Sequence, residues 1–236
     1  MGHMHSRRHS PRRHGATRRV LASLVATAAT VALAACAPTR FETQTDMPQP
    51  LIEKIPIVVG VHMPREFSEK VYEEKRENGG GEYSIGLGKA QAAGFMRILN
   101  AMFNRVVPVA APAAGAATDP EIRGVLEPVL VDFSFVTPID SGSPMYAASL
   151  RYTIKLYSPT GELAESWTFT GYGSQPASQF PGKGDEALAL ATRLAMRDAG
   201  AKLAAEFREQ AIARGLLPSA RPAVPAEVEA PPPNRR

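Results

Sequence analysis

The chain contains a single cysteine, Cys36, and its thiol is the most reactive side chain that the sequence presents. An arginine-rich start and an apolar run, Val20 to Leu33, precede it. The run is too short and too rich in alanine for a transmembrane helix, which needs ~20 strongly apolar residues. A charged region, here residues 1–19, followed by such a run and small residues is typical of a secretory signal. The spacing therefore predicts an export signal that ends near Cys36.

The four residues Leu33, Ala34, Ala35 and Cys36 resemble the lipobox of bacterial lipoproteins, and every position fits that pattern. The resemblance implies a diacylglyceryl group on the Cys36 thiol, removal of residues 1–35 as a signal peptide, and acylation of the new amine, as with palmitate. One acyl chain binds a membrane marginally, whereas two or more hold stably. In that family an aspartate after the cysteine retains the protein in the inner membrane. Ala37 instead implies the outer membrane of a Gram-negative bacterium, with the chain facing the periplasm.

Two alternatives concern this leader. Cys36 could be a chance cysteine in an apolar helix, but the charged region, the apolar run and the box are all in register. The stretch Thr17 to Leu21 has some likeness to a twin-arginine export signal. Six arginines among nineteen residues make that match expected by chance, so we favour ordinary export. Met4 is an alternative start of translation.

Removal of the leader reverses the apparent charge of the protein. The full chain has 27 basic and 23 acidic residues, a net charge of +4. The leader holds no acid and six of the basic residues, which are Arg7, Arg8, Arg12, Arg13, Arg18 and Arg19. The remaining 21 basic residues against 23 acidic ones give a net charge of −2. We therefore predict no nucleic-acid partner, because that binding depends on excess positive charge.

No constellation typical of an enzyme is evident outside the leader. His62 is the one histidine there, so neither a zinc site nor any cofactor is predicted. A catalytic triad would have to use His62, which we interpret as an ordinary histidine at the end of a strand. Acidic residues at 73, 74 and 77 alternate with Lys75 and Arg76, as on a solvated face. We predict that the protein is not an enzyme.

Two further patterns have structural explanations. The stretch Gly86-Leu87-Gly88-Lys89 lacks the first glycine and the hydroxyl of a phosphate-binding loop, so we interpret it as the start of a helix. Three aromatic residues of one strand, Trp167, Phe169 and Tyr172, could line a ligand groove. More often such residues alternate between the core and the surface of a sheet.

Hydrophobic periodicity divides the chain into a tether (residues 36–54), a globular domain (55–217) and a Pro/Ala-rich disordered tail (218–236). Residues 65–82 are predicted as a strand, Ser68–Arg76, followed by a glycine turn, with a short helix as the alternative. Pro128 predicts a bulge or a sheet edge. The other expected elements are strands at 55–63, 106–110, 122–136, 146–157 and 163–172, and helices at 87–103 and from Asp185 to about Ala213.

This order of elements predicts an α+β two-layer sandwich, with a mostly antiparallel sheet and two helices packed on one face. Together with the lipobox it resembles small YajG-like lipoproteins of proteobacteria and, more loosely, transport-auxiliary lipoproteins and the lipopolysaccharide-assembly lipoprotein. The features that carry the resemblance are the strand Ile57 to Val61, Gly86-x-Gly88, the step from Phe103 to Val107, a Gly-Glu hairpin turn and the segment Ala195 to Ala199. It covers Ile55 to about Arg214 and implies a binding or scaffolding protein without a known active site.

Three functions are therefore weighed. The first is a membrane-anchored binding or assembly module that presents a polar sheet face or the charged loop to an envelope protein. The second is a carrier of lipid or glycan, with its ligand between sheet and helices. The third, which has the least support, is an envelope hydrolase.

Overall fold

The computed structural model describes residues 38–45, 47, 49–51, 53–77 and 81–213, with side chains placed as far as Phe207. The predicted signal peptide, the lipobox residues, Cys36 and the predicted tail lie outside the described residues. The chain forms two compact units. Unit 1 takes Met1–Arg40 and Glu73–Ser84, and unit 2 takes Phe41–Tyr72 and Ile85–Arg236. Each unit is described by itself.

A five-stranded sheet forms the centre of unit 2, in the order β5-β2-β6-β7-β8. The strands are β2 (Ile55–Val61), β5 (Phe103–Pro108), β6 (Ile122–Val136), β7 (Met145–Tyr157) and β8 (Leu163–Pro176). β2 pairs in parallel with both β5 and β6, whereas β6–β7 and β7–β8 are antiparallel. The α+β class is confirmed, but the prediction of a mostly antiparallel sheet is wrong because the sheet is mixed.

The parallel pairs follow from how the chain returns to the sheet. After β2 the chain leaves the sheet and comes back through the helix α3 (Gly88–Met102) directly into β5. A crossover through a helix brings a strand back in the same direction as the first one, so β5 lies parallel to β2. The run Ile57-Val58-Val59 suits a strand with neighbours on both edges.

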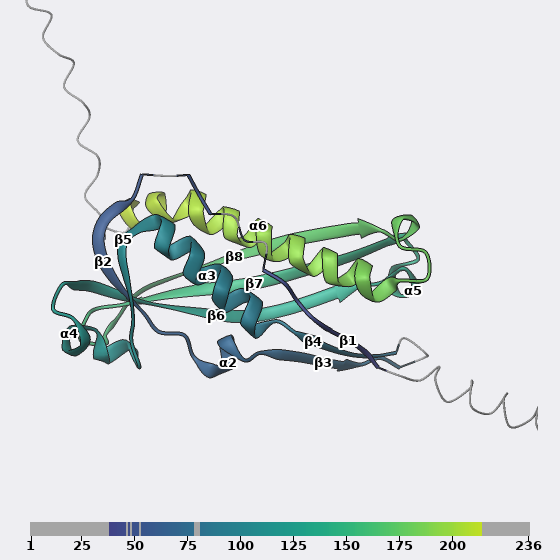
Figure 1. The fold of residues 1–236 in the computed structure, drawn as a ribbon, viewed down its shortest axis with the longest axis horizontal. Coiled ribbons are helices and arrows are strands. Elements are labelled where there is room, and N and C mark those ends of the chain that lie inside the picture. The colour runs from purple at the N-terminus through teal and green to yellow at the C-terminus, as the bar shows by residue number, and fades with distance from the viewer. Residues whose placement is uncertain (1–37, 46, 48, 52, 78–80, 214–236) are drawn as a thin grey trace, which may run out of the picture. The chain divides into compact units, whose positions relative to one another are not determined.

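Two helices, α3 and α6 (Gly184–Ala213), cover one face of this sheet, as predicted (Figure 1). The alternation of Leu150, Tyr152, Ile154 and Leu156 in β7 places these side chains in the core. Tyr152 lies edge-on to Phe95 of α3, with ring centroids 5.2 Å apart. Its hydroxyl donates to the buried side chain of Gln91, which in turn donates to the carbonyl oxygen of Phe67. At this point of the core the buried polar side chains of Tyr152 and Gln91 therefore satisfy each other and the Phe67 carbonyl oxygen.

The backbone of α6 lies directly against β8. Ideal Cβ atoms on Gly171 and Gly173 would stand 2.1 Å from the carbonyl oxygens of Ala195 and Ala191, respectively. The helix meets these glycines with small side chains that are fully buried, namely Ala191, Ala195 and Ala199. In the same helix Met196 is also fully buried, whereas Leu194 is only half-buried.

A smaller core lies at the other end of the sheet and joins Val109, Ile122 and Val125. Val58, Val107 and Tyr157 pack against it. The connection from β5 to β6, with η1 (Pro112–Ala114) and α4 (Gly115–Thr118), closes over it, because a Cβ on Gly115 would meet Val125 at 2.7 Å. This second core fixes the end of the sheet where β2, β6 and β7 meet.

The strand β6 has the predicted bounds, and Pro128 lies just beyond the last residue of β6 that pairs with β2, Leu126. The missing amide of Pro128 therefore faces an edge, which confirms one of the two predicted reasons for that proline. The bulge falls elsewhere. Leu130 pairs with Tyr152 and Asp132 with Arg151, so Val131 is the extra residue and its side chain is 48% exposed.

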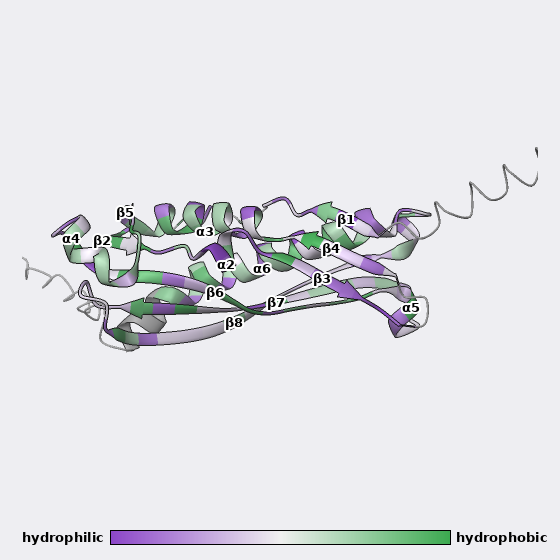
Figure 2. Ribbon diagram, turned by 90° about the horizontal axis from the view of Figure 1, so that it is seen from below, coloured by the Kyte–Doolittle hydropathy of each residue, from purple (hydrophilic) through white to green (hydrophobic). Residues whose placement is uncertain are grey.

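A second sheet has the strand order β1-β4-β3, with β1 (Thr39–Glu42), β3 (Val71–Lys75) and β4 (Glu82–Gly86). Residues 65–82 contain both predicted alternatives, since the short helix α2 (Arg65–Ser68) precedes β3. Figure 2 shows β3 as largely hydrophilic. Beyond its end, the Arg76 amide donates to the carbonyl oxygen of Gly81 at 2.9 Å.

Part of the segment expected to be a tether is ordered. β1 begins at Thr39, and Met47 is only 1% exposed. Ideal Cβ atoms on Gly94 of α3 and Gly200 of α6 would come within 2.4 Å and 3.2 Å of the Met47 side chain. Two glycines on neighbouring helices thus form the slot that Met47 fills, so residues before Ile55 take part in packing the domain.

Candidate functional site

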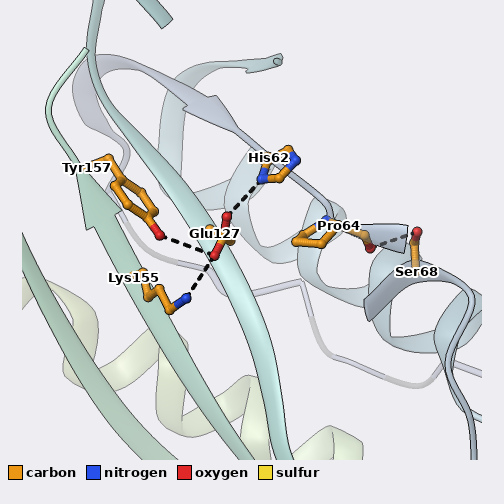
Figure 3. A network of polar contacts seen from close by, with 6 residues as sticks. All are labelled: His62, Pro64, Ser68, Glu127, Lys155 and Tyr157. Atoms are coloured by element: carbon orange, nitrogen blue, oxygen red, sulfur yellow. Dashed lines mark hydrogen bonds and ion pairs between the residues drawn. The ribbon is translucent and has the colours of Figure 1, made fainter. Parts of the chain in front are cut away.

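Three side chains meet around Glu127 in unit 2 (Figure 3). One carboxylate oxygen lies 2.8 Å from Nδ1 of His62. The other accepts hydrogen bonds from the Lys155 ammonium at 3.1 Å and from the Tyr157 hydroxyl at 3.3 Å. The Glu127 side chain is only 11% exposed, so its charge is held in place by these three partners. We call these residues the Glu127 cluster.

The sheet register positions the Glu127 cluster. Glu127 of β6 stands directly opposite Lys155 of β7, and Val125 stands opposite Tyr157. Since side chains two residues apart on a strand share a face, Lys155 and Tyr157 both point to the face of Glu127. His62 follows the last residue of β2, and its amide donates to the carbonyl oxygen of Leu126. Three strands therefore contribute to one cluster.

The electrostatics of the Glu127 cluster favour the charged carboxylate. Burial alone would raise the pKa of Glu127, but hydrogen bonds from His62 and Lys155 outweigh it, so this pKa lies below the usual value. The hydrogen bond to Glu127 raises the pKa of Lys155. Burial, reinforced by the negative charge of Glu127, raises the pKa of Tyr157. At neutral pH the cluster contains a carboxylate, an ammonium and a neutral phenol.

A carboxylate bonded to Nδ1 of an imidazole is also the orienting pair of many hydrolases. Such a pair needs a nucleophile, and the nearby hydroxyl of Ser68 donates instead to the carbonyl oxygen of Pro64 at 3.1 Å. The hydrogen bonds of the Glu127 cluster join its members to one another. The arrangement thus acts as an ionic clamp that ties the end of β2 to β6 and β7.

Of the Glu127 cluster, the sequence drew attention to His62 alone. It predicted this residue to be an ordinary histidine at the end of a strand. The alternation in residues 150–157 does place Lys155 on the polar face. The partnership with Glu127 depends on the pairing register of two strands 28 residues apart, which no local pattern records.

The remaining predicted site residues are dispersed. Cys36 and the other lipobox positions lie outside the described residues. In unit 1 the charge run forms ion pairs, Glu74 with Arg76 at 2.9 Å and Lys75 with Glu82 at 2.5 Å. The guanidinium of Arg76 also lies 5.2 Å from the ring centroid of Tyr83. These contacts link the charged strand and its neighbour.

The Gly86-Leu87-Gly88-Lys89 stretch is the start of α3, as predicted. The amides of Leu87 and Gly88 both donate to the carbonyl oxygen of Lys70 at 2.9 Å. A Cβ on Gly88 would lie 2.3 Å from the amide nitrogen of Lys70. The glycine is explained by this close approach of two backbone segments.

The three aromatic residues of β8 separate as their alternation suggests. Trp167 and Phe169 are in the core, whereas Tyr172 is 64% exposed. Tyr172 borders a hollow of about 600 Å³ between β7, β8 and α6. The other residues that line this hollow are Ala147, Ala148, Gly173, Ser174, Leu194, Arg197, Asp198 and Ala201.

The described part of the chain contains neither a metal-binding group nor a membrane-spanning helix. Within it, no group of three or more histidine, cysteine, aspartate or glutamate side chains is placed to hold a metal ion. None of its helices combines the length and apolarity needed to cross a membrane.

Comparison with known proteins gave distant structural likenesses. A protein of the DUF330 family from Xanthomonas campestris is 14% identical with a TM-score of 0.49, and the match covers 75% of this chain and 99% of that one. A minor lipoprotein from Acinetobacter baumannii is 13% identical, with a TM-score of 0.39 and coverage of 72% and 100%. The hypothetical protein CT253 from Chlamydia trachomatis is 7% identical, with a TM-score of 0.40 and coverage of 69% and 99%.

No family model matches the chain, and no curated protein matches it. The likenesses are too distant to carry an argument about function. A specific relation to YajG-like proteins stays a prediction.

Proposed function

We propose that the protein is a lipid-anchored lipoprotein of the bacterial cell envelope that acts as a binding or assembly module without catalysis. The observation that carries this proposal is the lipobox at Leu33 to Cys36, in register with a charged region and an apolar run. Three acyl chains on Cys36 would hold the protein on its membrane. The outer membrane, facing the periplasm, follows from Ala37, and the partner is an envelope protein.

The Glu127 cluster supports a binding role over a catalytic one. Its charged groups are bonded to one another and its imidazole has no hydroxyl partner in the cluster, as described above. His62→Ala and Glu127→Gln variants should therefore keep the function of the protein as long as they fold. Loss of function in a variant that is still folded under the assay conditions would count for the hydrolase.

The anchor is tested by Cys36→Ala in the full chain. We expect this variant to lose membrane attachment, or to accumulate uncleaved, because it lacks the acceptor thiol. Membrane fractions and intact mass report both outcomes. Ala35→Gly is a matched control, since glycine fits the same lipobox position. Membrane-bound Cys36→Ala of normal mature mass would contradict the lipoprotein proposal.

A carrier of lipid or glycan is the second candidate, because the hollow beside Tyr172 has a volume within the range of small-molecule sites. The close contact of α6 with Gly171 and Gly173 opposes a ligand between helix and sheet. The carrier would be favoured over the assembly module if a ligand is extracted from the purified protein and is absent from the Leu194→Arg variant.

A further inference from the structure

One end of unit 2 is built from three parts, which are joined through residues next to them. They are α5 (Pro138–Ser141), η2 (Ala177–Gln179) and the first turn of α6. The amide of Ala177 donates to the carbonyl oxygen of Pro144 at 2.9 Å. The Tyr146 hydroxyl lies only 2.4 Å from where a Cβ on Gly184 would stand. We call this the α5 end of unit 2.

The α5 end presents an apolar side chain on a well-fixed turn. Ile139 is 79% exposed, the second-highest value among the large exposed apolar side chains of the described residues. A capping box fixes its helix, because Asp140 accepts hydrogen bonds from the amide and the hydroxyl of Thr137 at 2.7 and 2.8 Å. Gly142, with φ of 65°, ends the helix. The turn thus holds Ile139 in water, where it gains nothing from burial.

The chain enters unit 2 close to this end. Glu42 and Gln44 line a hollow of about 300 Å³ together with Phe180 and Glu186. Phe180 follows η2, and Glu186 lies in the first turn of α6. Cys36 precedes Glu42 by six residues. An extended chain of that length spans at most ~20 Å. Whatever conformation the intervening residues adopt, the backbone of Cys36 therefore lies within about that distance of Glu42.

We propose that the α5 end faces the bilayer and that Ile139 enters its interfacial region as a second, protein-borne membrane contact. The inference rests on the proposed lipidation of Cys36, which brings a lipid surface within reach of this end. The contact is apolar and not electrostatic, because Lys183 is paired with Glu186 at 2.8 Å and Asp140 belongs to the capping box. The charges of the α5 end offer no excess positive charge to anionic lipid.

The opposite end of the β7–β8 hairpin supplies the contrast. Leu163 is 58% exposed and pairs with Tyr157, at the far end of β7 from Met145. Twelve residues of strand separate these positions by roughly 40 Å. Leu163 is therefore an apolar, exposed side chain that the proposed orientation keeps in water.

The test places a thiol-reactive, environment-sensitive dye at Ile139→Cys or, as matched control, at Leu163→Cys. Lipidated full-length protein is used, so the Cys36 thiol is consumed by the lipid and the new cysteine is the reactive one. The samples are reconstituted in vesicles of phosphatidylethanolamine and phosphatidylglycerol. We expect a blue shift and several-fold weaker quenching by aqueous iodide at position 139, and neither at 163.

Intact mass of the same samples separates the two proposals. Equal quenching at both positions in protein that carries the lipid overturns the inference and leaves the anchor standing. Protein that lacks the lipid overturns the anchor, and with it the inference. Both variants replace exposed side chains, so matching unfolding midpoints are expected and are measured first.

Discussion

Glu127 illustrates how a residue can hold a sheet end together through charge. Its carboxylate bonds to His62, Lys155 and Tyr157, which come from the end of β2 and from β7. Hydrogen bonds to charged groups contribute more than neutral ones, and a buried partner left unpaired is costly. The Glu127 cluster therefore sets the stability of this corner of unit 2.

We predict that Glu127→Gln lowers the free energy of unfolding by about 1–3 kcal/mol at pH 7, since the Lys155 ammonium loses its charged acceptor. Glu121→Gln is the control, because Glu121 is 70% exposed at its surface ion pair and such pairs contribute about 0–1 kcal/mol. Urea unfolding measures both. Equal effects of the two substitutions would contradict the assignment of a clamp.

The same residue predicts a pH dependence. The pKa of Glu127 in the folded protein lies below its usual value, so its contribution to stability is fully present above the unfolded pKa. It is lost as the pH falls through the lower, folded pKa. The stability difference between the native protein and Glu127→Gln should thus shrink in urea titrations carried from pH 7 towards pH 3. A difference that grows on acidification would refute this sign.

Residue types alone identified the lipobox and predicted the core face of β7. They did not identify the Glu127 cluster, because His62, Glu127 and Lys155 meet only through strand register. They also did not indicate that Gln91 is buried, since its partners, the Tyr152 hydroxyl and the Phe67 carbonyl oxygen, are 61 and 24 residues away.

At the scale of elements, α6 and β8 are matched by small residues. Gly171 and Gly173 face Ala191, Ala195 and Ala199, so the helix backbone reaches the strand. The buried alanines of α6 recur at helical spacing, so the sequence indicates the face that they form. The glycines of β8, taken from the local sequence alone, indicate only that the strand is weakened there. Only the packing of α6 explains these glycines, because a larger side chain at either position would overlap the helix backbone.

We predict that Gly171→Ala destabilises the protein by about 1–3 kcal/mol or more, because the added methyl overlaps the carbonyl oxygen of Ala195 and forces α6 outward. Ser174→Ala, an exposed change on the same strand, should have little effect. Thermal unfolding compares the two. A Gly171→Ala protein as stable as Ser174→Ala would show that α6 does not approach the strand this closely.

The exposed edge of β8 is occupied by side chains of α6. Asp198 accepts the Tyr172 amide at 2.9 Å, and Lys202 donates to the carbonyl oxygen of Thr170 at 2.6 Å. Asp198 and Lys202 also pair with each other at 2.8 Å. Charged groups on an edge prevent another strand from adding there. These contacts argue that a protein partner does not extend the sheet at these residues.

We predict that Asp198→Ala accelerates hydrogen exchange of the Tyr172 amide and increases self-association, because an edge amide becomes available. Glu206→Ala, on an exposed position of the same helix, is the control. Exchange is followed by NMR and self-association by analytical ultracentrifugation. An unchanged exchange rate at Tyr172 would mean that Asp198 does not protect the edge.

At the scale of the whole molecule, the described strands begin close to the proposed anchor. β1 starts at Thr39 and Met47 fills a slot between α3 and α6, within a segment whose prolines and polar residues read as a tether. Local composition missed this because one methionine reaches two glycines, Gly94 and Gly200, that are far along the chain. The crossover that makes the sheet mixed was hidden for the same reason.

We predict that Met47→Ala lowers the free energy of unfolding by about 2–5 kcal/mol, the cost of emptying a core position. Leu51→Ala is the matched control, because Leu51 is fully exposed and lies four residues further on. Denaturant unfolding of the mature chain measures both. Indistinguishable midpoints would indicate that the segment is a tether after all.

The central claim is that Cys36 anchors this domain to a membrane. Mass spectrometry of the amino-terminal peptide, taken from protein purified out of membranes, tests it most directly. The account predicts that this peptide begins at Cys36 and carries the mass of a diacylglyceryl group and an amide-linked acyl chain. A peptide that begins elsewhere, or an unmodified Cys36, would contradict it.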